Sequence, residues 1–177
     1  MMYAKVIPDG KSKGVWYEVV PSITHLVHSG SRVYCNSADG LVLGEASVVI
    51  DGVSDDVFEK ATGFFPEYEV VAVIISLNIN DIYVPESYNK FHPSKAAVID
   101  NVVDSLVNNI GELYHAWCAF RLGVEADGCR YVLRDNYVIY RFMKRIDFDR
   151  PECIVSGDDE SIFDVYGTMV RKAVQDE

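Results

Sequence analysis

The spacing of apolar residues along the chain predicts two long helices. After Pro93, apolar residues recur at steps of three and four, which is the period of a helix with one buried face. This face would carry Ile99, Val103, Leu106, Ile110, Leu113 and Trp117, so the pattern predicts a helix over residues 94–122. Near the C-terminus, Ser156 and Asp159 have the spacing of a capping box ahead of a second apolar stripe. We expect a helix there over residues 157–174.

A third and shorter helix is expected over residues 55–62. Ser54 stands immediately before it, and a serine hydroxyl at this position can accept a hydrogen bond from an amide of the first turn. Asp55 and Asp56 follow, and acidic side chains favour the positive end of a helix. Gly63 is expected to end the helix.

Strands are indicated by short runs rich in valine, isoleucine and aromatic residues. The runs Met2–Ile7 and Val15–Val20 are separated by the turn residues 9–14, so they predict a hairpin. Further strands are expected at Arg32–Cys35, at Leu41–Ile50 (as one strand or two), and at Glu69–Leu77. We expect Asp81–Val84 to pair with Glu69–Leu77 across the turn Asn78–Asn80.

A second hairpin is predicted near the end of the chain. Cys129–Arg134 and Tyr137–Lys144 lie on either side of Asp135-Asn136, which suits a two-residue turn. Runs of strands with a few helices between them are typical of the α+β class. The prediction is therefore a single α+β domain over residues 1–177, with a mainly antiparallel sheet.

The 27 acidic residues outnumber the 16 lysines and arginines, which gives a formal net charge of −11. The net charge is +2 over residues 1–35, −11 over residues 36–127 and −2 over residues 128–177. Because DNA and anionic membrane surfaces repel an acidic protein, we expect neither direct nucleic-acid binding nor membrane binding. The middle of the chain carries the excess of acid.

Acidic and aromatic residues alternate in the most acidic stretch, and this pattern suits a protein interface. The leading hypothesis is a non-catalytic inhibitor, viral or from a mobile element, that docks on a basic nucleic-acid-handling protein such as a nuclease. The predicted contact residues are Asp51, Asp55, Asp56, Glu59, Glu67, Tyr68 and Glu69. The alternative is a solvated acidic face that keeps the protein soluble, with Phe58, Phe64 and Phe65 in the core.

The second predicted hairpin suggests a competing function. One side of such a ribbon would carry Arg130, Arg134, Tyr137 and Arg141. These side chains could bind a phosphate or carboxylate, so the competing hypothesis is a small-anion or phosphorylated-ligand binding protein or enzyme. Alternatively, acidic residues of the same chain, such as residues 158–160, neutralise these arginines.

Other chemistry is weakly indicated. His115 and Cys118 lie three residues apart on the long predicted helix, but with no third ligand or base beside them. No phosphate-binding glycine loop is found, so no cofactor, metal or catalytic residue is predicted. The four widely spaced cysteines and the lack of a signal-peptide pattern favour free thiols and a cytoplasmic protein. The hydrophobic content is compatible with a homo-oligomer.

Overall fold

The computed structural model describes residues 1–88, 90, 91, 93–112 and 121–157. Within these residues the chain forms two compact units, one of residues 1–75 with 155–157 and the other of residues 76–154. Each unit is described by itself, and the single domain expected from the sequence stays a prediction. Helices and strands are both present, which confirms the α+β class.

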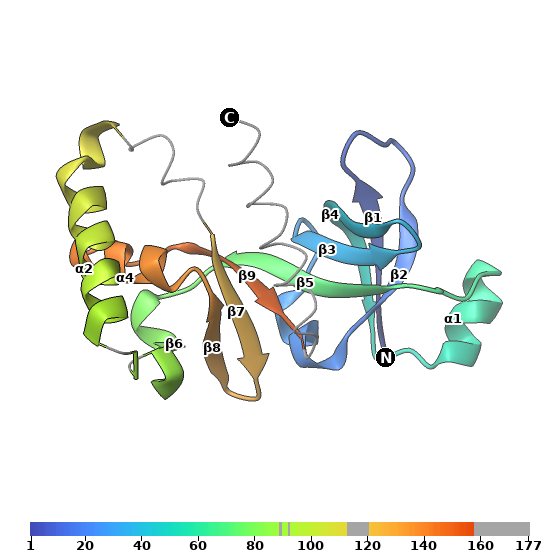
Figure 1. Cartoon of the computed structure of the whole chain (residues 1–177). Coiled ribbons are helices and arrows are strands. Elements are labelled where there is room, and N and C mark those ends of the chain that lie inside the picture. The colour runs from blue at the N-terminus through green and yellow to red at the C-terminus, as the bar shows by residue number, and fades with distance from the viewer. Residues whose placement is uncertain (89, 92, 113–120, 158–177) are drawn as a thin grey trace. The chain divides into compact units, whose positions relative to one another are not determined.

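The first unit is built on five strands that close into a barrel (Figure 1). The strands are β1 (Met2–Pro8), β2 (Val15–Val19), β3 (Arg32–Ser37), β4 (Gly40–Asp51) and β5 (Glu69–Ser76). Their order is β2-β1-β4-β3-β5, and a parallel pairing of β2 with β5 completes the ring. The sheet of this unit is therefore a closed barrel, which the prediction of a mainly antiparallel sheet did not include, and β2 pairs with β1, β1 with β4, and β3 with β4 and β5 in the antiparallel sense.

Side chains of the barrel strands form a buried core, with burial at alternate positions on β2 and β3 and at four consecutive positions, residues 70–73, on β5. Buried positions on the five strands include Ala4, Val6, Tyr17, Val19, Val33, Cys35, Ala46, Val70 and Ala72. The hairpin predicted from the first two runs is confirmed as β1 and β2. The Leu41–Ile50 region is one strand rather than two.

Gly44 lets β4 continue unbroken beside β1. A Cβ atom at this position would lie 2.6 Å from the carbonyl oxygen of Ile7 and 2.7 Å from a methyl group of Val6. A side chain larger than hydrogen would therefore collide with the neighbouring backbone. Gly44 therefore allows the close pairing of β4 with β1.

The short helix α1 (Asp55–Thr62) confirms the predicted range 55–62. Gly63 ends it in the left-handed conformation with φ 67°, and its amide donates to the Glu59 carbonyl at 2.8 Å. The predicted role of the Ser54 hydroxyl is wrong, because that side chain makes no capping hydrogen bond. The Ser54 carbonyl instead accepts from the amides of Val57 and Phe58.

The aromatic side chain of Phe58 packs α1 against the barrel. Phe58 is 1% exposed and stacks on Tyr3 with ring centroids 3.9 Å apart, while its edge meets Trp16 at 5.2 Å. The Tyr3 hydroxyl donates to the Asp55 carboxylate at 2.5 Å. Burial, followed by this hydrogen bond to an anion, raises the pKa of Tyr3.

The second unit contains four strands in the order β9-β7-β8-β6. They are β6 (Ile82–Tyr83), β7 (Leu122–Asp127), β8 (Arg130–Asp135) and the first residues of β9 (Glu152–Ser156). Two helices accompany them, α2 (Pro93–Asn108) and α4 (Tyr137–Arg145). Short 3-10 turns occur at Pro21–Leu26 in the first unit and at Ile79–Asp81 and Glu86–Tyr88 in the second.

The pairing expected for Asp81–Val84 is wrong. Its strand, β6, pairs in parallel with β8 instead of folding back on β5. After β5, the amides of Leu77 and Ile79 donate to the carbonyls of Pro151 and Asp149, which keeps the chain extended alongside the segment before β9. A 3-10 turn then redirects it, with the Asn78 side chain accepting from the Asn80 amide.

The second predicted hairpin is also wrong. The partner of β8 is β7, and the segment expected to return as a strand is the helix α4. Asn136 precedes this helix in the left-handed conformation with φ 62°, and its side-chain amide donates to the Arg121 carbonyl at 2.6 Å. Ile139, Phe142 and Met143 have helical spacing, and the last two are buried.

The predicted long helix is interrupted after Asn108, where α2 ends. Residues 110–112 are helical again, and Leu122, the expected end of the helix, is instead the first residue of β7. Ile99 and Val103 are buried, as the apolar stripe requires, while Leu113 and Trp117 lie outside the described residues. The predicted helix 157–174 also lies outside the described residues, except for its first residue.

Candidate functional site

The predicted contact residues gather around α1 in the first unit. This acidic surface consists of Asp51, Asp55, Asp56, Glu59, Glu67, Tyr68 and Glu69, from the end of β4 to the start of β5. Its carboxylates are exposed, except that Asp55 is partly covered and accepts the hydrogen bond from Tyr3. Tyr68 is half-buried.

The closure of the barrel brings a further acid, Glu18, next to the acidic surface, and the sequence did not predict this. Glu18 on β2 stands beside Glu69 on β5 in the parallel pairing that closes the barrel. Partial burial, then the charges of Asp55 and Glu69, raise the pKa of the Glu18 carboxyl. No local pattern links Glu18 to residues 55 and 69, because only the barrel closure brings them together.

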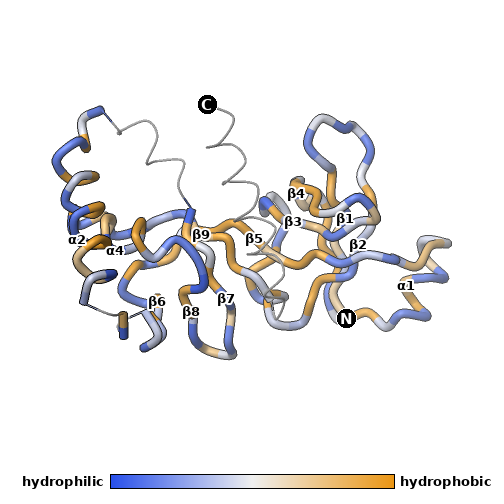
Figure 2. Tube along the Cα trace, in the orientation of Figure 1, coloured by the Kyte–Doolittle hydropathy of each residue, from blue (hydrophilic) through white to orange (hydrophobic). Residues whose placement is uncertain are grey.

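Apolar side chains are exposed among these acids. Phe58 belongs to the core, as the alternative interpretation required, but Phe64 and Phe65 are 43% and 46% exposed. Val57 on α1 is 57% exposed. Figure 2 shows the mixture of hydrophilic and hydrophobic positions along α1 and the segment after it. The exposed phenylalanines give the acidic surface the apolar contact area that a protein interface uses.

The acidic side chains of the two units differ in how they are neutralised. In the second unit, arginines and lysines pair with acids of the same unit, as in Lys90–Glu86, Arg121–Glu152, Arg134–Glu125, Arg141–Asp100 and Arg145–Asp104. Among the described residues of the first unit, Arg32 pairs with Asp9. Within the described part of the chain, no carboxylate of the acidic surface forms an ion pair.

The predicted arginine face does not form. Arg130 and Arg134 lie on β8, whereas Tyr137 and Arg141 lie on α4, so the prediction that one side of a ribbon carries all four residues is wrong. Arg134 pairs with Glu125, and a guanidinium nitrogen of Arg141 lies 2.6 Å from the Asp100 carboxylate. Same-chain acids do neutralise these two arginines, and they come from β7 and α2; residues 158–160 lie outside the described residues.

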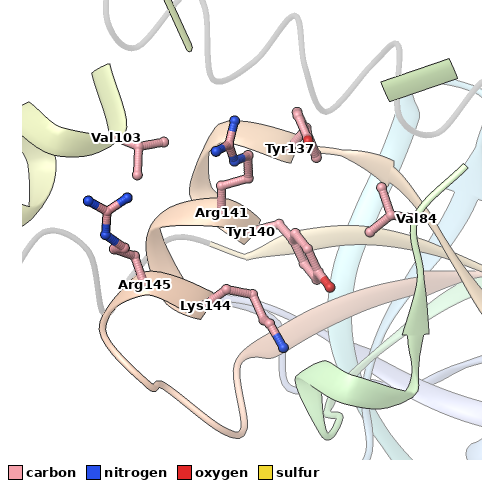
Figure 3. A pocket seen from close by; sticks show the side chains of 7 residues that line it. All are labelled: Val84, Val103, Tyr137, Tyr140, Arg141, Lys144 and Arg145. Atoms are coloured by element: carbon pink, nitrogen blue, oxygen red, sulfur yellow. The ribbon is translucent and has the colours of Figure 1, made fainter. Parts of the chain in front are cut away.

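Two of the predicted anion-binding residues nevertheless share a cavity. Tyr137 and Arg141 line a space of about 360 Å³ in the second unit together with Val84, Val103, Tyr140, Lys144 and Arg145 (Figure 3). The sequence analysis did not combine Tyr140 with these cations. A helical period applied to residues 137–145 would have grouped residues 137, 140, 141 and 144 on one face.

The described residues contain no group of three or more His, Cys, Asp or Glu side chains arranged to hold a metal ion. Cys35, Cys129 and Cys153 are free thiols. Burial raises the pKa of Cys35 and Cys153 to about 12, which keeps both protonated and poorly nucleophilic. His115 and Cys118 lie outside the described residues. In the described part of the chain, no helix is long and apolar enough to cross a membrane.

No protein-family model and no curated protein matches this chain. Among solved structures, it is similar to sulfiredoxin from Arabidopsis thaliana, with 13% identity and a TM-score of 0.34. The match covers 51% of this chain and 91% of the sulfiredoxin chain.

Proposed function

We propose that this protein is a non-catalytic inhibitor that docks the acidic surface around α1 onto a basic, nucleic-acid-handling protein. The observation that carries the proposal is a set of carboxylates that form no ion pair within the described residues and lie beside exposed phenylalanines. A surface acid that is merely solvated needs no apolar neighbour, whereas an interface needs both charge and apolar area.

In this proposal the carboxylates attract the basic partner, and the exposed apolar side chains form the contact area. Carboxylates without a cationic partner leave a negative potential that attracts a basic groove and accelerates encounter, most strongly at low salt. Phe64 and Phe65 can then be buried against the partner, and burying an aromatic ring contributes about 1.5–3 kcal/mol. Occupying the groove would exclude nucleic acid from it.

A charge-reversal variant tests the proposal while sparing the fold. Asp51, Asp56, Glu59 and Glu67 are exposed, whereas Asp55 is excluded because it bonds to buried Tyr3. A panel of purified basic endonucleases serves as the probe, with plasmid cleavage measured at increasing inhibitor concentration. We expect inhibition by the wild type and its loss when the four acids are replaced by lysine.

The matched control changes the same number of exposed acids elsewhere, with Asp39, Glu45, Asp127 and Asp149 replaced by lysine. It has the same net charge as the first variant, so retained inhibition would show that position matters as well as charge. Replacing Phe64 and Phe65 by serine tests the apolar part, with an expected loss of at least tenfold in affinity, or about 1.4 kcal/mol. If the charge-reversal variant and the variant with serine at positions 64 and 65 both inhibit as well as the wild type, the proposed surface is rejected.

Binding should also weaken steeply as salt rises from about 50 to about 200 mM. If the affinity of the charge-reversal variant and its dependence on salt both equal those of the wild type, the acidic surface is not the contact.

A further inference from the structure

The cavity beside α4 has an uneven charge. Three cations line it, and two of them are neutralised by α2: Arg141 contacts Asp100 at 2.6 Å, and Arg145 contacts Asp104 at 3.0 Å. These two pairs repeat at a four-residue interval on both helices. Both ion pairs connect α4 with α2 along the wall of the cavity that contains Val103.

Lys144 supplies the third cation and forms no ion pair within the described residues. Its ammonium nitrogen donates to the side-chain oxygen of Asn80 at 2.7 Å, which is a neutral partner. Arg141 also has further N–H donors, because a guanidinium carries five N–H groups and the contact with Asp100 involves one of its nitrogens. Within the described residues, the lining therefore holds one positive charge that no carboxylate pairs with and further N–H donors on Arg141.

Aromatic and apolar side chains form the rest of the lining. Tyr140 and Lys144 extend from α4 in a similar direction, with Val84 facing Tyr140, while Arg145 lies on the Val103 side (Figure 3). Tyr137 is held by stacking on Tyr88, with ring centroids 4.8 Å apart, and the Arg141 guanidinium lies 5.9 Å from the Tyr137 ring. In the described residues the Tyr140 hydroxyl has no hydrogen-bond partner, so it can donate to a ligand.

We propose that this cavity is a binding site for a small organic phosphate with a flat apolar body. A guanidinium and an ammonium both suit phosphate oxygens, and the fork of donors on arginine suits them best. The tyrosine rings and the two valines match an aromatic ring attached to that phosphate. A volume of about 360 Å³ is at the small end of ligand pockets and fits a molecule no larger than a mononucleotide.

Titration calorimetry on the full chain tests the site. Phenyl phosphate is the main probe, with inorganic phosphate, phenylacetate and benzyl alcohol as comparisons that remove the ring, the phosphate or the charge. We expect saturable binding of phenyl phosphate and weaker binding of the other three. The variant Lys144→Gln should bind phenyl phosphate about tenfold more weakly or worse, because it loses a charged hydrogen bond.

Lys95→Gln is the matched control, because Lys95 is an exposed lysine of α2 in the same unit that does not line the cavity. Tyr140→Phe removes one hydroxyl and should weaken binding several-fold with little effect on folding. Lys144 also lies in the last turn of α4, where cations favour the helix dipole. A thermal melt of each variant therefore separates lost binding from lost structure.

Several results would overturn the site. These are the absence of saturable binding to the wild type, binding unchanged in Lys144→Gln, and equal losses in Lys144→Gln and Lys95→Gln. A preference for phenylacetate over phenyl phosphate would overturn the choice of phosphate. Loss confined to Lys144→Gln and Tyr140→Phe, with melting temperatures close to that of the wild type, would support it.

Discussion

The substitution Phe58→Ala tests whether one ring holds α1, and with it the acidic surface, on the barrel. Burial of a phenyl ring contributes about 1.5–3 kcal/mol, and each aromatic pair adds about 0.5–1.5 kcal/mol. Phe58 is 1% exposed and makes two such pairs, with Tyr3 and Trp16. We therefore expect the free energy of unfolding to fall by about 3–5 kcal/mol, the usual range for a buried phenylalanine replaced by alanine.

Urea denaturation followed by tryptophan fluorescence measures this loss. The chain has two tryptophans, Trp16 and Trp117, so a Trp117→Phe background makes Trp16, which touches Phe58, the reporter for the first unit. The expected loss would lower the urea midpoint by at least about 1 M. Inhibition of a basic nuclease should fall together with the fraction of folded protein.

Val57→Ala is the control, because Val57 is the adjacent residue of the same helix but is 57% exposed. It should change the free energy of unfolding by less than about 0.5 kcal/mol. A loss below about 1 kcal/mol for Phe58→Ala would refute the reasoning, since it would mean that the stacked ring does not anchor the helix.

Three further predictions concern other contacts. Gly44→Ala should lower the free energy of unfolding by about 1–3 kcal/mol, because the added methyl group would lie 2.6 Å from the Ile7 carbonyl oxygen; an unchanged melting temperature would contradict this. The raised pKa of Glu18 means that the folded state binds a proton more tightly than the unfolded state, so the associated stability is present below about pH 4 and is lost as pH rises through the folded pKa. Glu18→Gln should therefore be more stable than the wild type near pH 7, by about 0.5 kcal/mol or less, and this advantage should vanish near pH 3 in parallel melts. Asp100→Asn should cost less than about 1 kcal/mol in urea denaturation, since Asp100 and Arg141 are partly exposed, and a larger cost would show a buried role for the pair.

Local sequence patterns correctly predicted those helices and strands for which several neighbouring residues indicate the same structure. The helix α1 has acidic residues at its start and glycine at its end, and the hairpin of β1 and β2 has a clear turn between β-rich runs. The residues of the acidic surface follow from the same stretch of sequence. Their exposure and their lack of ion pairs did not, because these depend on which bases fold close to them.

The helix α4 shows where local reasoning fails. Tyr137–Lys144 alternates well enough for a strand, but Ile139, Phe142 and Met143 equally fit a helix, and a short apolar run cannot separate the two. Asn136 was interpreted as a turn residue between strands, whereas its left-handed conformation leads into the helix. A strand at this position would put Arg134 and Arg141 on one side of a ribbon, whereas in the structure they pair with Glu125 and Asp100.

Long-range pairing limited the rest of the prediction. The contact between Glu18 and Glu69 spans about fifty residues, and β6 and β8 pair over a similar separation. Neither has a local signal, because parallel pairing requires a long connection whose length and path the flanking residues do not specify.

The closed barrel restricts how this protein can be recognised. Within the described residues each of its five strands has a neighbour on both sides, so none of them is an edge strand along its whole length to which an extended segment of another chain could add. A partner must therefore contact side chains and cannot extend the sheet through backbone hydrogen bonds. On the proposed function, specificity would rest on a few replaceable residues around α1, which could change with the target while the barrel beneath them stays the same.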